Sequence, residues 1–445
     1  MTHDLPIVDC DLMIIGTGLT GMAAALFASG RGIDTVQVGM TGELNYASGL
    51  LDLMGVHPVE NGRRWQNPWA AIAAMTGDLP EHPYARTETP DMRAAFAGLL
   101  DFLEKFGLPY YHEPERNLQV VTPVGTLKTT YAVPSTVRDG VRALSTRPQC
   151  LIAGFKGLKG FSALQIAESL RPGWPGLRAC RVEFPGADPG DLYPERMALH
   201  LEMAENRARL AEIILPHLAD AEVVGLPAVL GLYRTQAVFE DLRERLGRPV
   251  FEIPTMPPSI SGMRLKQVFE QHLPARGVRP YYRHQVLSVG HSCRSGFRFA
   301  VGEREPEVIV RARGAILASG RFFGKGLHAD RDRIRETVFG LPVHQPDSRA
   351  LWHRKGFLER RGHAVNRAGV ETDNRLRPLA ANGKAAFSSL YAAGSILAHQ
   401  DWVRQKCGSG LAIVTAYAAV KDFALTGFSY IGTRSNRTPS EGRNI

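Results

Sequence analysis

The first forty residues carry the apolar pattern of a strand, a tight turn, a helix and a second strand. An apolar run, Leu12-Met-Ile-Ile15, ends in Gly16-Thr-Gly18-Leu-Thr-Gly21 and passes directly into an alanine-rich segment. We therefore expect a strand that ends at Ile15, a helix over Gly18–Ser29 and a second strand over Thr35–Val38. This order of elements is typical of the first half of a dinucleotide-binding βαβ unit.

The three glycines of this turn each have a separate role in that kind of unit. Gly16 permits the tight turn, Gly18 lets a pyrophosphate approach the backbone, and Gly21 lets the helix pack closely on the strand. The N-terminus of the helix then faces the anion. The motif predicts a nucleotide or flavin site, and the alternative is a glycine turn of purely structural use.

The second strand lacks the acidic residue that usually binds the adenosine ribose at its end. The segment Val36-Gln37-Val38-Gly39 contains no acid, and Glu43 lies too far along the chain. This departure argues against NAD and against standard ribose recognition in FAD. It leaves the predicted phosphate contacts intact.

The middle of the chain has a different pattern. Residues 56–90 read as irregular, residues 90–106 as a helix, and residues 118–133 as a β-hairpin around a Pro-x-Gly turn. Residues 150–170 repeat a strand, a glycine turn and a helix. Their glycine spacing favours a crossover within an inserted domain over a second phosphate site. Further elements are expected in the following order: helices at 194–217 and 234–246, a buried strand at 250–253, and a helix from Ser259 to about Leu273.

The last third contains two more glycine turns that follow apolar strands. The segment Ala315-Ile-Leu-Ala-Ser319-Gly320-Arg321 leads into a glycine-rich turn. Later, Ala393-Gly394-Ser395 and Lys406-Cys-Gly408-Ser409-Gly410 precede an apolar helix. We predict that these turns bind a cofactor through Ser319, Gly320, Gly394, Ser395, Gly408 and Gly410.

Ser48 and Gly49 follow the second strand and open an apolar segment. They either place backbone N–H groups against a flavin or form a simple helix cap in which Ser48 accepts from the backbone. We include both as candidate cofactor-binding residues, beside Gly16, Gly18 and Gly21.

Three glycine turns far apart in the sequence fit one cofactor held by one discontinuous domain. The predicted fold is α/β, a Rossmann-like FAD/NAD(P)-binding flavoprotein domain with an inserted α+β domain. We assign residues 7–58 and 250–432 to the flavin-binding domain and residues 59–249 to an inserted substrate or partner domain. Residues 433–445 are expected to be a disordered tail.

Composition narrows the function classes. The 445 residues are 44% hydrophobic and 22% charged, with a net charge of +9. That mild excess suits an anionic ligand, an anionic membrane surface, an acidic partner or simply a basic solvated surface. There is no basic patch with aromatic residues for nucleic acid, no signal peptide and no membrane-spanning run. The five scattered cysteines argue against an iron–sulfur or zinc site and fit a reducing cytoplasm.

The three signatures, in this order, resemble two-domain flavoproteins of the fumarate reductase and succinate dehydrogenase type. From about residue 10 to 425 the chain is still more similar to the family of B subunits of anaerobic glycerol-3-phosphate dehydrogenases. The resemblance rests on five segments, beginning at Ser48-Gly-Leu-Leu-Asp, Val121-Thr-Pro-Val-Gly, Pro254-Thr-Met-Pro-Pro, Leu317-Ala-Ser-Gly-Arg and Gly369-Val-Glu-Thr-Asp.

The resemblance implies a membrane-associated respiratory enzyme. In that family the A and B subunits form the catalytic dimer, and an iron–sulfur C subunit docks it to the cytoplasmic side of the inner membrane. The complex oxidises sn-glycerol 3-phosphate to dihydroxyacetone phosphate and passes electrons to quinone. The family assigns FMN to its B subunits, whereas the Gly-x-Gly-x-x-Gly turn keeps FAD as the alternative.

The same resemblance implies which residues act on the substrate. Arginine or lysine would clamp the substrate phosphate, and Arg264, Arg321 and Lys325 are the candidates because each lies in or beside a glycine turn. His399 is the candidate base by position. The segment from Ile396 to Trp402 lacks the glycine pair expected after Gly394-Ser395, which is a departure from the family pattern.

Overall fold

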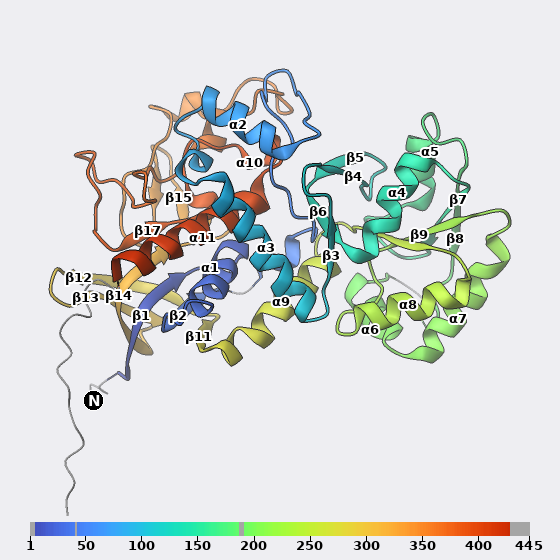
Figure 1. The fold of residues 1–445 in the computed structure, drawn as a ribbon, viewed down its shortest axis with the longest axis horizontal. Helices are drawn as coiled ribbons and strands as arrows, with labels where there is room; N and C mark the ends of the chain where they lie inside the picture. The colour runs from blue at the N-terminus through green and yellow to red at the C-terminus, as the bar shows by residue number, and fades with distance from the viewer. Residues whose placement is uncertain (1–4, 41, 187–190, 428–445) are drawn as a thin grey trace, which may run out of the picture.

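The computed structural model describes residues 5–40, 42–186 and 191–427, which form two lobes that lie side by side (Figure 1). The predicted tail, residues 433–445, falls outside the described residues. The first lobe is built on a seven-stranded sheet of order β11-β2-β1-β14-β13-β12, with β17 paired to β14. Its strands are β1 (Ile7–Ile15), β2 (Thr35–Gly39), β11 (Val278–Tyr282), β12 (Gln285–Ser292), β13 (Gly296–Gly302), β14 (Val308–Leu317) and β17 (Leu390–Ala392).

The centre of this sheet is parallel, and its strands end at a common edge. β1 pairs in parallel with β2 and with β14, and Ile15 lies opposite both Val38 and Leu317. The turns that follow β1 and β14 therefore leave the sheet side by side. Ligands of open α/β sheets bind at this carboxyl edge. β12 and β13 extend the sheet as an antiparallel meander beyond β14.

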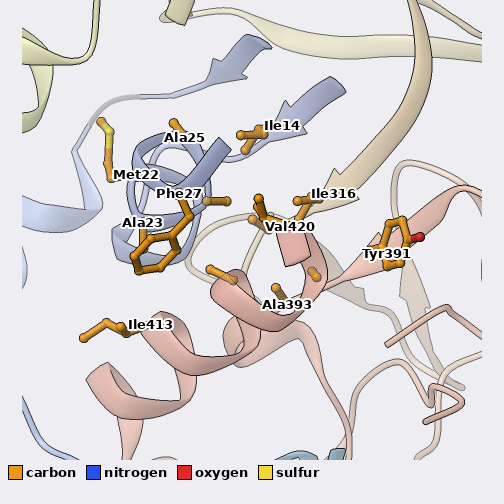
Figure 2. Close-up of a cluster of buried hydrophobic side chains, with 14 of the residues drawn as sticks. Ile14, Met22, Ala23, Ala25, Phe27, Ile316, Tyr391, Ala393, Ile413 and Val420 are labelled. Carbon is orange, nitrogen blue, oxygen red and sulfur yellow. The ribbon is translucent and has the colours of Figure 1, made fainter. Parts of the chain in front are cut away.

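Helices α1 (Leu19–Ser29), α3 (Thr89–Lys105) and α11 (Gly408–Gly427) pack together in the core of the first lobe. Figure 2 shows Met22 and Phe27 of α1 and Ile413 and Val420 of α11 in one cluster with Ile14 and Ile316 of the sheet. α1 is buried on nearly all sides because its alanines and Gly21 let neighbouring backbones approach. The predicted first strand, helix and second strand are confirmed within one or two residues.

One helix of the first lobe was not expected from the pattern. α2 (Pro68–Asp78) lies within the segment predicted to be irregular. The Asn67 side chain accepts from the N–H groups of Trp69 and Ala70, and Pro68 occupies the first helical position. This is a strong helix start that the surrounding prolines and glycines obscured. The lobe also contains α9 (Ile260–His272), α10 (Trp402–Gln405) and the short pair β15 (Leu327–Ala329) and β16 (Ile334–Glu336).

The second lobe has its own sheet and core. Its four strands are all parallel, in the order β10-β9-β7-β8, and helices cover them. The elements are β7 (Cys150–Phe155), β8 (Leu177–Val182), β9 (Val223–Pro227), β10 (Val250–Ile253), α4 (Arg138–Thr146), α5 (Ala163–Leu170), α6 (Pro194–Leu201), α7 (Ala204–Ile214) and α8 (Thr235–Leu246).

The predicted fold class is confirmed, but this lobe differs from the expected α+β insertion. It is an α/β unit, because parallel strands need crossover connections and α5 and α8 supply them. The strand at 250–253, which the sequence pattern assigns to the flavin-binding domain, pairs with β9 of the second sheet. In addition, α2 and α3 contribute Trp69, Phe96 and Leu99 to the first core rather than to the second.

Two small antiparallel pairs lie between the main sheets. β3 (Tyr110–His112) pairs with β6 (Ala132–Pro134), and β4 (Leu118–Val121) pairs with β5 (Leu127–Thr130). The second pair is the predicted hairpin, whose turn is closed by the N–H of Thr122 donating to the carbonyl of Thr126. This hairpin brings Lys128 toward the first lobe, where its ammonium group meets Asp52 at 3.0 Å.

Candidate functional site

The turn after β1 has the geometry of a phosphate-binding turn. A Cβ atom at Gly16, whose φ is +136°, would lie 2.2 Å from the Ala318 carbonyl oxygen, and one at Gly21 would lie 2.0 Å from the Gly16 carbonyl oxygen. Both positions therefore require glycine for packing alone. At Gly18, by contrast, the nearest atom is the Glu43 Cβ at 4.0 Å. The open side of Gly18 faces a cavity, which is the side from which a ligand would approach.

That cavity has a volume of about 1100 Å³ and lies at the carboxyl edge of the first sheet. Its wall is formed by residues from the turns after β1, β2 and β14, by Ser48 and by the start of α11. Seven of the predicted cofactor-binding residues line it: Gly16, Gly18, Ser48, Ser319, Gly320, Ser395 and Gly408. All three glycine turns therefore contribute to one site.

The other four predicted residues lie behind the cavity wall and serve packing. Gly21 holds α1 against the turn, as described above. A Cβ at Gly49 would lie 2.5 Å from the Ser261 side chain, and one at Gly394 would lie 2.0 Å from the Thr20 hydroxyl oxygen. At Gly410 it would lie 2.3 Å from the Tyr84 hydroxyl oxygen. These glycines shape the cavity from outside, because a side chain at any of them would displace the wall.

Arg321 lines the cavity, but backbone oxygens accept its hydrogen bonds. Its Nε donates to the Ser395 carbonyl at 2.8 Å and its Nη2 to the Gln400 carbonyl at 3.1 Å, and Nη1 donates to the carbonyl of Asn366. Burial lowers the pKa of Arg321 to about 10. The side chain therefore ties the 319–326 turn to the 395–400 segment, a role that the sequence pattern did not indicate. Lys325 also lines the cavity and is exposed.

Arg264 does not reach the cavity, which corrects its predicted role as a phosphate clamp. Its guanidinium group is 2% exposed and donates from Nη1 and Nη2 to the two carboxylate oxygens of Glu252, at 2.6 and 2.9 Å. Its Nε donates to the Gly231 carbonyl at 2.9 Å. Glu252 lies on β10, so the ion pair joins α9 to the second sheet.

His399 also lies outside the residues that line the cavity. Its Nε2 is 2.7 Å from Glu371 Oε1, and its Nδ1 is 3.4 Å from Glu81 Oε2. Glu81 and Glu371, the two carboxylates that flank the imidazole, are also absent from the cavity lining. The imidazole is therefore not placed to take a proton from a molecule in the cavity.

The structure adds charged cavity residues that the motifs did not single out. Lys128, which lies on strand β5 of the predicted hairpin, pairs with Asp52. Asp401 pairs with Arg404 at 3.3 Å, and both line the cavity. A signal existed for the first pair, since Asp52 and Lys128 each sit in a segment that carries the family resemblance. No local pattern could have shown that the two segments meet.

Glu43, which the sequence pattern places too far along the chain to bind a ribose, lines the cavity. Its Cβ is the atom nearest to the open side of Gly18. Burial raises the pKa of Glu43, and its Oε2 is buried without a hydrogen-bond partner among the described residues. Ser319 Oγ and Asp52 Oδ1 line the same cavity and are likewise buried and unpartnered. A buried polar atom without a partner costs about 1–3 kcal/mol, so these three atoms fit a polar ligand that the residues would hold.

A glycine turn at a helix N-terminus, a second glycine turn beside it and one cavity lined by both are the features of a protein of the flavoprotein class. Residues 11–411 match the family model of the FAD binding domain. The chain is 30% identical to the B subunit of the anaerobic glycerol-3-phosphate dehydrogenase of Vibrio vulnificus, over 92% of this chain and 95% of that protein. It is 32% identical to the probable B subunit of the same enzyme of Halobacterium salinarum, over 93% and 97%.

The chain belongs to the FAD-binding-domain family and, within it, to the B subunits of anaerobic glycerol-3-phosphate dehydrogenase. Its relatives are thus FAD-dependent oxidoreductases, and a flavin is the cofactor class of the fold. Among the described residues, no helix is both long and apolar enough to cross a membrane.

Solved structures with related shapes were also found. A 3-ketosteroid-Δ4-(5α)-dehydrogenase from Rhodococcus jostii, crystallised with 4-androstene-3,17-dione, is 11% identical with a TM-score of 0.40, over 94% of this chain and 97% of that one. A flavocytochrome c3 fumarate reductase is 9% identical with a TM-score of 0.42, over 94% and 79%.

Proposed function

We propose that this chain is the flavin-containing subunit of a membrane-associated respiratory dehydrogenase. The complex would oxidise sn-glycerol 3-phosphate to dihydroxyacetone phosphate and pass the electrons to quinone. The observation that carries the proposal is the single cavity lined by all three glycine turns, in a chain whose relatives are named as subunits of this enzyme. A bound flavin would supply the hydride acceptor.

We further propose FAD rather than the FMN expected from the family resemblance. FMN has no adenosine ribose, so it would leave Glu43 without a use. Glu43 lines the same cavity as Gly18 and follows the second strand, the part of this fold from which an acid usually contacts the ribose. The N–H groups at the start of α1 have no side-chain cap and would donate hydrogen bonds to the pyrophosphate.

Cations on the cavity wall would position a phosphorylated substrate. Lys128 and Arg404 line the cavity, and each pairs with a carboxylate, Asp52 and Asp401 respectively. A phosphate monoester pairs well with such cations. Lys325, exposed on the 319–326 turn, would add a third positive charge.

The proposed partners are a catalytic A subunit and an iron–sulfur C subunit that anchors the complex at the cytoplasmic face of the inner membrane. The support is that the relatives are named as subunits of a larger enzyme.

Large apolar side chains also surround the cavity. Six exposed ones line it, namely Met40, Tyr46, Phe322, Phe323, Trp402 and Val403, and we call them the apolar rim. Exposed apolar patches of this kind mark protein interfaces.

A second candidate function is electron relay, in which this chain binds flavin but does not oxidise the substrate. The position of His399 favours it, because the predicted base lies outside the cavity. A stand-alone flavoprotein acting on another substrate is a third candidate and predicts turnover without partners.

One experiment separates these candidates. The absorbance spectrum of the purified chain is recorded before and after anaerobic addition of glycerol 3-phosphate, and the released cofactor is identified by mass. A flavin that bleaches on its own supports a dehydrogenase. A flavin that bleaches only when the A subunit is added supports relay, and a chain that binds no flavin contradicts both. Release of FMN alone would overturn the assignment of FAD.

A further inference from the structure

Outside the flavin cavity, two histidines and a glutamate converge from three separate segments. The nearest ligand atoms of His344, Glu371 and His399 all lie within 4.8 Å of one another. Glu371 Oε1 is 2.7 Å from His399 Nε2 and 3.7 Å from His344 Nδ1, and the two imidazole rings have centroids 4.2 Å apart. Ligands at zinc-bond lengths of about 2.0–2.2 Å in a tetrahedron are separated by comparable distances.

The backbone that carries these side chains is ordered by hydrogen bonds. The N–H of His344 donates to the Gly369 carbonyl at 2.8 Å, and the N–H of Gly369 donates back at 3.1 Å. On the other side, Val370 bonds to the 396–398 segment in a parallel bridge. The segment that contains Glu371 is therefore hydrogen-bonded to the segments of both histidines. A metal ion would find the three ligands positioned before it binds.

A fourth residue, Glu81, lies where an outer-shell partner of a metal ligand would lie. His399 presents Nε2 toward Glu371 and His344, while its Nδ1 faces Glu81 Oε2 at 3.4 Å. Histidines that ligate metals usually donate their other ring N–H to a carboxylate, which fixes the tautomer and the orientation of the ring.

We infer that His344, Glu371 and His399 form a binding site for a divalent transition-metal ion of the zinc type. Two imidazoles and one carboxylate suit Zn²⁺, and three protein ligands leave one position for water or an external ligand. The His399 and Glu371 side chains are 17% and 47% exposed, so an ion could enter from solvent. A bound ion would rigidify the 395–400 segment, in which the carbonyls of Ser395 and Gln400 accept hydrogen bonds from Arg321 of the cavity wall. The sequence pattern predicted no metal site, because the ligands are far apart in the chain.

The test is a zinc titration of the untagged chain against a chromophoric chelator, followed by Co²⁺ substitution and its visible spectrum. We expect one site, a cobalt spectrum of low coordination number, and an affinity reduced more than about tenfold in H344A and in E371Q. The variant H399N suits this position because Asn tolerates the backbone φ of +62° found at His399. The outer-shell variant E81Q should weaken binding by about 10–100-fold.

The matched control is H353A. His353 is exposed and its ring lies 5.3 Å from that of His363, but no carboxylate joins this pair in the described part of the chain. It should bind zinc as the unaltered chain does. The inference is overturned if the chain binds no zinc at micromolar concentrations, or if H344A and H399N bind it as tightly as H353A does. Because the readout is metal affinity, the outcome is independent of flavin binding and of glycerol 3-phosphate oxidation.

Discussion

At the scale of single residues, Glu43 is the side chain whose surroundings say most about the cofactor. Glu43 lines the cavity with one carboxylate oxygen buried and unpartnered, although it comes four residues after the end of β2. It is the first residue of a short 3₁₀ segment, Glu43–Tyr46. We propose that this segment supplies the ribose-binding acid that the strand lacks.

We predict that E43Q lowers the affinity for FAD by about 10–100-fold, because a hydrogen bond to a charged acceptor contributes about 1.5–3 kcal/mol. The affinity for FMN should not change, since FMN carries no adenosine ribose. Both affinities are measured by fluorescence quenching on the flavin-free chain. E305Q, which alters an exposed glutamate outside the cavity, is the control. An equal loss of FAD and FMN affinity would argue against this role.

His82 predicts the pH dependence of stability. It is fully buried, its Nδ1 accepts from the N–H of Tyr84, and burial lowers its pKa to about 3. The unfolded chain binds a proton near its ordinary pKa of about 6.5, whereas the folded chain does not. The unfolded state therefore binds more protons between these two values. The contribution to stability is complete above about pH 6.5 and is lost as the pH falls toward 3.

We therefore expect H82N to reduce the pH slope of the free energy of unfolding by roughly 1 kcal/mol per pH unit between pH 6 and 4. Asparagine keeps a side-chain acceptor for the Tyr84 N–H, so the local cap is preserved. Denaturant unfolding at several pH values provides the measurement. The slope is diagnostic, since lost packing would shift stability equally at every pH. An unchanged slope would show that His82 is not the responsible group.

At the scale of elements, the buried Arg264–Glu252 pair joins α9 of the first lobe to β10 of the second. Thr136 also donates to the Glu252 carboxylate, and the Leu230 N–H donates to its other oxygen. Both oxygens of this carboxylate are therefore satisfied by donors from different segments. The network positions the two lobes relative to each other without any contact with the cavity.

Breaking this pair from one side should be severely destabilising. We expect R264M to lower the free energy of unfolding by about 3–5 kcal/mol, because it leaves a buried carboxylate unpaired. The double variant R264M/E252L should recover much of that loss, since apolar replacement of a buried pair is often neutral. Urea unfolding of the two variants measures both values. A stable R264M chain with a raised KM for glycerol 3-phosphate would instead restore Arg264 as a substrate residue.

At the scale of the whole molecule, we propose that the partner subunit covers the apolar rim. Phe323 is 67% exposed and its ring packs edge-on against Tyr46, 5.1 Å between centroids, and both residues line the cavity. A subunit that covers this rim would exclude water from the flavin and bring a second redox centre close to it. Apolar aromatic anchors of this kind dominate the energy of protein interfaces.

We expect F323S to weaken the complex with the A subunit by about 5- to 30-fold, the effect of losing an anchor worth about 1–2 kcal/mol. Flavin content should remain unchanged. F357S is the matched control, because Phe357 is 88% exposed but does not line the cavity. Association is measured by analytical ultracentrifugation of the mixed subunits. If F357S and not F323S weakens binding, the partner lies on a different face.

The local sequence was sufficient for the elements and for the phosphate-binding turn. Strand β1, helix α1 and the hairpin of β4 and β5 follow from apolar periodicity and glycine placement within about thirty residues. Gly21 could be assigned because its requirement for glycine arises within one turn, where a Cβ would meet the Gly16 carbonyl oxygen. The positive φ of Gly16 is also local, whereas its contact with Ala318 comes from a distant segment. Even α2 had a local signal, because Asn67 is a favourable N-cap residue and Pro68 is favourable at the first position of a helix.

Only the tertiary structure decided the roles of the charged side chains. Arg264, His399 and Glu43 look alike in sequence, each a polar residue near a glycine-containing segment. Their functions depend on partners that lie elsewhere in the chain: Glu252 for Arg264, Glu371 for His399, and the Gly18 turn for Glu43. Backbone conformation is fixed by nearest neighbours, but the electrostatic environment of a side chain is set by whatever the fold packs against it. The chain by itself therefore specified the class of fold and its flavin-type turns, and the packing of distant segments determined which residues face the ligand.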